Sequence, residues 1–279
     1  MPRVRPRRRR RYRRAAGAPP AVSRYLRATA PGEIDRLDGG GYQGLSFGAE
    51  FCHRRLPPQG KVAEAALRCR AFKMGFSLVT PVVREGAFEA VSRWLIRAAQ
   101  SLPGVECVFN DWGLLAWAVD RRLPVRPIAG RLLSRQRRGP RVVAMAQAAG
   151  PEEAEILRGS VWDDPVAARL LGEFGVGRVE LDLLLQGTNR PSVPPGVRWS
   201  ACAPWLPVTV TPSCPWSEDP LGCPRPCEDA PPVRLDNRED PRPLWSRGNA
   251  RFVRLQADPL CQAVALGADR LIWAGELPG

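Results

Sequence analysis

Lysine, histidine and long apolar runs are scarce in this sequence of 279 residues. Lys61 and Lys73 are the only lysines among 42 basic residues, and His53 is the only histidine. No run of about 18 apolar residues occurs, which excludes a transmembrane helix. No apolar segment follows the basic N-terminus, as a secretory signal would require. We therefore expect a cytoplasmic protein without a membrane span.

Several catalytic motifs are also missing. Any Ser-His-Asp or Cys-His mechanism would have to use His53, and no G-x-S-x-G sequence is present. The glycine-rich stretch "GGGYQG" precedes an expected strand rather than a helix, so it does not fit a phosphate-binding loop. His53 is better suited to a position beside Cys52, where it could donate a hydrogen bond to a metal-bound sulfur.

The formal net charge is +14, and nine of the first fourteen residues are Arg. Clustered Arg without acidic residues indicates a disordered arm, to which we assign residues 1–38. Such an arm could attract RNA in a salt-dependent way.

The remaining residues, 39–279, alternate short apolar runs with amphipathic segments. Strands that alternate with helices indicate parallel pairing, and roughly eight strands favour a single (β/α) barrel of the TIM type. The region 187–243 holds 14 of the 30 prolines and is expected to form long loops over the C-terminal rim. The segment 86–102 is expected to be a helix with Phe88, Val91, Leu95, Ala98 and Leu102 on one face.

Eight cysteines without a secretory signal indicate metal or redox chemistry rather than disulfides. Cys214, Cys223 and Cys227 share one proline-rich loop, and a four-thiolate site needs one more ligand. Cys52 follows the expected strand 42–50, and Cys214 ends the expected strand 206–214. Ends of parallel barrel strands share a rim, so the two thiols should meet there.

Cys202 is the rival fourth ligand, but it lies within an expected strand, where cysteine usually acts as a small buried hydrophobe. The same interpretation applies to Cys69, Cys107 and Cys261. Because C-x2-C pairs typical of zinc sites are absent, a 4Fe–4S cluster is favoured over zinc, which remains the alternative.

Polar residues at the ends of barrel strands are candidates for substrate contacts: Asn110, Asp111, Arg131 and Gln186. The alternative is that they cap loops. Glu180 and Asp182 alternate within an apolar strand, so both should point into the barrel, where Arg side chains would neutralise them.

Six stretches together resemble the U-32 peptidase family, and in particular its UbiV-like branch of iron–sulfur proteins. They are "LSFGAEFCHRR", "VFNDWGLL", "RPIAGRLLSRQRRGPR", "GRVELDLLLQG", "PVTVTPSC" and "ADRLIWAG". The resemblance implies a 4Fe–4S cluster held by Cys52, Cys214, Cys223 and Cys227. It also implies oxygen-independent hydroxylation, as in ubiquinone biosynthesis, of an aromatic or quinone-like molecule together with a paralogous partner subunit.

Two other activities within this family stay open. One is an RNA-modifying hydroxylase, which the Arg-rich arm would suit. The other is a U-32-type peptidase, although the glutamate- and cysteine-containing signature of the collagenase-like branch is absent.

Overall fold

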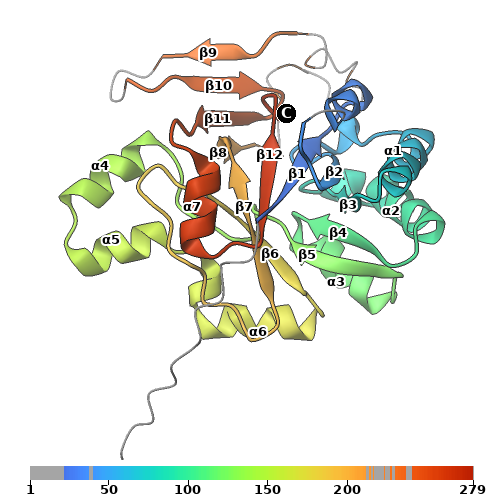
Figure 1. Ribbon diagram of the computed structural model, residues 1–279, viewed down its shortest axis with the longest axis horizontal. Coiled ribbons are helices and arrows are strands. Elements are labelled where there is room, and N and C mark those ends of the chain that lie inside the picture. Colours follow the sequence, from blue (N-terminus) through green and yellow to red (C-terminus); the bar gives the residue numbers. More distant parts are fainter. Residues whose placement is uncertain are drawn as a thin grey trace, which may run out of the picture.

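The computed structural model describes residues 22–37, 40–211, 214, 216, 223, 227, 230–236 and 241–278. Eight parallel strands close into a barrel, as the alternation of strands and helices predicts (Figure 1). In order around the barrel they are β1 (Ser23–Ala28), β12 (Arg270–Ala274), β7 (Arg198–Ala203), β6 (Arg178–Asp182), β5 (Val125–Ala129), β4 (Val105–Phe109), β3 (Gly75–Val79) and β2 (Gly44–Gly48).

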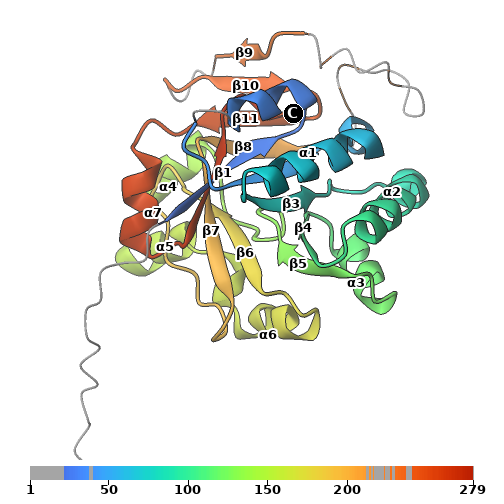
Figure 2. The same cartoon turned by 45° about the vertical axis from the view of Figure 1, so that its right-hand side comes forward.

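Helices surround the barrel and connect its strands (Figures 1 and 2). They are α1 (Gln59–Ala71), α2 (Phe88–Ser101), α3 (Trp112–Asp120), α4 (Pro140–Ala148), α5 (Pro151–Arg158), α6 (Pro165–Glu173) and α7 (Pro259–Leu266). The expected face of α2 is confirmed, because Val91, Leu95 and Ala98 are fully buried and Phe88 and Leu102 pack against the same core. No helix within the described ranges is long and apolar enough to cross a membrane.

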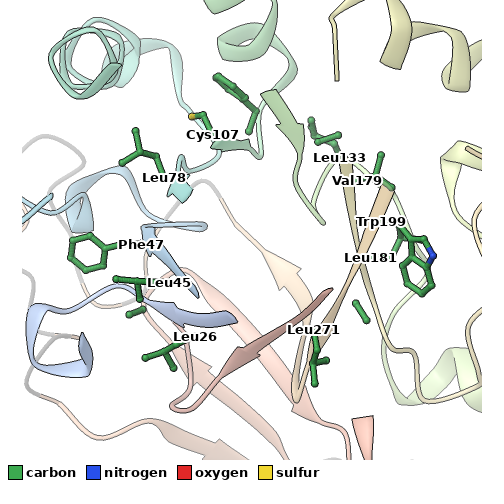
Figure 3. Packing of buried hydrophobic residues seen from close by; sticks show 14 of the residues in the cluster. Leu26, Leu45, Phe47, Leu78, Cys107, Leu133, Val179, Leu181, Trp199 and Leu271 are labelled. Atoms are coloured by element: carbon green, nitrogen blue, oxygen red, sulfur yellow. The ribbon is translucent and has the colours of Figure 1, made fainter. Parts of the chain in front are cut away.

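The main hydrophobic core lies between the outer surface of the barrel and the helices. Leu26, Leu45, Phe47, Leu181 and Leu271 belong to it, together with apolar residues of the helices (Figure 3). Successive side chains of a strand point to opposite faces. The residues next to these core positions therefore point into the barrel, where many of them are polar.

A second, four-stranded antiparallel sheet lies at one end of the barrel (Figure 2). Its strands, in spatial order, are β8 (Trp205–Val210), β11 (Ala250–Arg254), β10 (Leu244–Arg247) and β9 (Val233–Leu235). The chain enters this sheet directly after β7 and leaves it for α7. Because parallel strands end at one rim, an insertion after β7 lies at the C-terminal rim, where barrel proteins build their sites.

Two expectations about domain organisation are wrong in detail. The barrel begins with β1 at Ser23, inside the range 1–38 that we assigned to the arm. Within the range 187–243, β8 and β9 belong to a four-stranded sheet at the rim, where we expected long loops. The Arg-rich stretch 1–21, with its expected RNA contact, lies outside the described residues.

The strand over residues 206–214 is also placed differently from the expectation. It forms β8, which pairs antiparallel with β11 in the small sheet and is not a barrel strand. The place in the barrel that we expected this strand to take is occupied by β1, which pairs with β2 and β12. The number of barrel strands is therefore as expected, although one member was misassigned.

Candidate metal centre

Cys52 lies four residues beyond the end of β2, at the start of a short 3₁₀ turn over His53–Arg55. Burial raises the pKa of its thiol above the usual value. The backbone N–H groups of Arg54 and Arg55 lower this pKa. The Cys52 side chain does not cap the turn with a hydrogen bond. The thiol is thus half-buried beside backbone donors that favour its anionic form.

The three late cysteines lie near Cys52 and near one another. Burial raises the pKa of Cys227, Arg55 lowers it, and the charges of Cys214, Cys52 and Cys223 raise it further. Cys52 in turn interacts electrostatically with Cys214 and Cys223. Charge interactions weaken with distance. Cys52 and the late cysteines therefore lie close together in the fold, although more than 160 positions separate them in the sequence.

The β10–β11 turn holds the two cysteine segments together. Arg247, at the end of β10, donates from Nε to the carbonyl oxygen of Cys227 at 3.3 Å and from Nη1 to that of Leu277 at 3.1 Å. Asn249, on the other side of the turn, donates to the carbonyl oxygen of Phe51 at 2.8 Å. The insertion therefore joins the residue before Cys52 to the loop of the late cysteines.

Apolar contacts support the same junction. Phe51 packs edge-to-face on Phe252 of β11, with ring centroids 5.1 Å apart, and shares a buried cluster with Ala250 and Leu277. Such aromatic pairs contribute about 0.5–1.5 kcal/mol beyond their buried area. The loop that carries Cys52 is thus held to the small sheet by both the backbone and the side chain of Phe51.

Among the described residues, no group of three or more His, Cys, Asp or Glu side chains is arranged to hold a single metal ion. A zinc ion would need all four sulfurs at about 2.3 Å from one centre. A 4Fe–4S cubane binds one thiolate at each iron, so its four ligands surround a larger object. Four thiolates are the donor set that such a cluster takes.

Beneath Cys52, a network of buried charges fills the mouth of the barrel. Glu50 forms ion pairs with Arg27 at 2.7 Å and with Arg131 at 2.6 Å. Arg27 also pairs with Glu180 at 2.6 Å, and Arg131 pairs with Asp182 at 2.9 Å. Arg138 completes the network with a second contact to Asp182, which gives three cations and three anions.

This network confirms that Glu180 and Asp182 point into the barrel and are neutralised by arginines. Burial raises the pKa of Glu180 above its ordinary value, against the effect of Arg27. Burial would also raise the pKa of Glu50, but Arg131 and Arg27 hold it below the ordinary value. The pKa values of the two carboxyl groups are therefore shifted in opposite directions from the ordinary value. Arg27 was missed in the sequence because it lies within the range assigned to the arm.

The structure brings only one of the four predicted substrate residues into this network, namely Arg131. Asn110 donates to the carbonyl oxygen of Thr80 at 2.9 Å. Asp111 accepts from the backbone N–H of Leu114 at 2.9 Å and so caps α3. Gln186 donates to the carbonyl oxygens of Arg137 and Leu157, both at 2.9 Å. These three side chains hold loops in place, which was the alternative interpretation.

The remaining cysteines lie apart from the thiol group in the fold. Cys69 and Cys107 are buried, as expected, whereas Cys261 is exposed on α7 and is not a core residue. Cys202 is buried inside the barrel, beside Tyr25 and Ile272. His53 is half-buried next to Cys52, and burial followed by the charge of Arg54 lowers its pKa, so the ring is neutral near pH 7.

No family model matches this chain, and no curated protein matches it either. Among solved structures, one match is the U32 peptidase Mk0906, with 9% sequence identity and a TM-score of 0.47. The match covers 95% of this chain and 98% of that one.

Proposed function

We propose that this protein binds a 4Fe–4S cluster through Cys52, Cys214, Cys223 and Cys227 and takes part in oxygen-independent hydroxylation with a partner subunit. The observation that supports the proposal is that Arg247 and Asn249 of one turn hold the carbonyl oxygens of Cys227 and of Phe51, the residue before Cys52. The hydroxylation and its aromatic, quinone-like substrate follow from the resemblance of the sequence motifs. When bound, the cluster would supply electron transfer or activation of the oxygen donor.

The surroundings of the thiols affect how a cluster would bind. The pKa values of Cys52 and Cys227 are raised, mainly by burial, so both thiols are protonated near pH 7 in the absence of metal. Metal binding must displace these protons, which makes cluster assembly pH-dependent. Arg55 favours the thiolate of Cys227 and would also attract the negative charge of a cluster with four thiolate ligands.

The test is metal and sulfide analysis of the protein after anaerobic purification. We expect iron and acid-labile sulfide in equal amounts, with absorbance near ~400 nm. The variant Cys52→Ser should lose most of both, because one of the four ligands is removed. The matched control is Cys261→Ser, since Cys261 is exposed on α7 and should not affect the cluster.

Two results would contradict the proposal. One is stoichiometric zinc without sulfide in the anaerobic protein, which would support the zinc alternative. The other is an iron and sulfide content in Cys52→Ser equal to that of Cys261→Ser. Hydroxylation itself is tested separately, by adding the paralogous partner and an oxygen donor to the loaded protein and following substrate conversion without O₂.

A further inference from the structure

A cavity of ≈ 460 Å³ lies between the small sheet and the barrel. Pro204 at the β7–β8 junction, Trp245 of β10, Arg254 of β11 and Trp273 of β12 contribute to its walls. Its volume is within the range of about 300–1,000 Å³ that small-molecule sites occupy. The cavity is distinct from the thiol group, because Cys227 contacts the β10–β11 turn whereas Arg254 lies at the other end of β11.

The charges at this cavity are of one sign. Arg242 and Arg254 line it, and none of the described lining residues is acidic. The guanidinium carbon of Arg254 lies 5.5 Å from the centroid of the Trp205 ring, a cation–π contact that orients its exposed charge. Asp258, next to the lining residues Ala257 and Pro259, keeps its negative charge, but its carboxylate is directed to the N-terminus of α7, where it accepts from the backbone N–H of Leu260 at 2.9 Å. The cavity therefore attracts an anion.

Several rings contribute to the apolar part of the lining. Trp245 and Trp273 are each only half-buried, and Pro204, Pro243 and Pro259 contribute further ring surfaces. Trp245 is held edge-to-face against Trp205, with ring centroids 6.4 Å apart. Indole and pyrrolidine faces that are fixed in place favour a planar ring, because stacking on them costs little conformational entropy.

We propose that this cavity binds a small planar aromatic acid. Its ring stacks against the Trp and Pro surfaces, and its carboxylate pairs with the guanidinium group of Arg254. A guanidinium group binds a carboxylate through two parallel hydrogen bonds, which fixes the orientation of the ring. The site requires no metal cluster, so it stands independently of the function proposed above.

The test is calorimetric titration of the full chain with 2-naphthoate. We expect saturable binding that weakens at least tenfold for the neutral 2-naphthamide and for the non-planar decahydro-2-naphthoate. The variant Arg254→Gln should weaken 2-naphthoate binding at least tenfold. The matched control Arg251→Gln, at an exposed position on the same strand outside the cavity lining, should bind like the unmodified protein.

Circular dichroism melting of both variants reports whether they are folded, and Arg254 is exposed, so its replacement should leave the fold intact. The proposal is overturned if 2-naphthoate does not bind, if the three compounds bind equally, or if the two Arg variants behave alike. Tighter binding of adenosine monophosphate than of 2-naphthoate would also overturn it, because that result would make the cavity a nucleotide site.

Discussion

Replacing Arg131 with methionine should destabilise the protein strongly, because this side chain lies between two buried carboxylates. Its guanidinium group contacts Glu50 at 2.6 Å and Asp182 at 2.9 Å, and these three side chains are at most 3% exposed. Removing one partner of a buried ion pair leaves an uncompensated charge, at a cost of about 3–5 kcal/mol. For a domain of this size, that cost lowers the melting temperature by about 6–20 °C.

The variant also allows a test of charge balance. The intact network has three cations and three anions, so Arg131→Met leaves one excess negative charge. Adding Glu50→Gln restores the balance, because Arg27 and Arg138 then face Glu180 and Asp182. We expect the double variant to recover about 1–3 kcal/mol of the loss, the scale of coupling between residues in contact.

The assay is urea unfolding at pH 7, followed by circular dichroism, with Arg97→Met on the exposed face of α2 as the control. The control should change the free energy of unfolding by no more than about 0.5 kcal/mol. A cost for Arg131→Met equal to that of the control would refute the reasoning. So would a double variant that is less stable than Arg131→Met alone, since the loss would then not come from the unbalanced charge.

Three further outcomes follow from the same structure. The lowered pKa of Glu50 means that it contributes stability above pH 4.5, its ordinary pKa, and that this contribution is lost as the pH falls through the lowered value. The raised pKa of Glu180 means that the protein loses stability as the pH rises from 4.5 through the raised value. Glu50→Gln and Glu180→Gln should therefore change the pH dependence of the free energy of unfolding in urea in opposite directions. Changes of the same sign in the two variants would contradict this. Asp111→Ala removes the cap of α3 and should cost about 1 kcal/mol in the same assay, whereas Asp120→Ala at the other end of that helix should cost less. Gly48→Ala should prevent stable folding, because a Cβ there would lie 2.1 Å from the carbonyl oxygen of Val79 at a φ of +147°, and a soluble variant with unchanged melting would show that the close approach of β2 and β3 is not required.

The barrel could be predicted from the sequence because its signals are local. Alternating strands and helices require crossovers, and crossovers impose parallel pairing. The alternation of Val179, Glu180, Leu181 and Asp182 was likewise sufficient to place both carboxylates inside. In each case the information lies within a few consecutive residues, where side-chain direction follows directly from the strand period.

The pairing partners of strands could not be predicted in the same way. Residues 206–214 have the composition of a strand in any sheet, and nothing within them indicates that β8 pairs antiparallel with β11, about 40 residues later. The strand β1 was hidden for a different reason, since it follows a long Arg- and Pro-rich stretch whose composition is typical of disorder. The sequence argument placed Cys214 at the rim as the end of a barrel strand, and that step was wrong, because β8, the strand before it, belongs to the small sheet.

The segment Glu50–Cys52 links the barrel interior to the thiol group. Glu50 points into the barrel and joins the ion network, and Phe51 packs against the small sheet, with the guanidinium group of Arg131 5.5 Å from its ring centroid. Cys52 follows on the side of the late cysteines. Since Glu50 is held by the ion network and Phe51 by the small sheet, the backbone just before Cys52 is fixed on both sides of Phe51. The buried charges, although costly to bury, thereby fix the position of the thiol that is most distant in sequence from its partners.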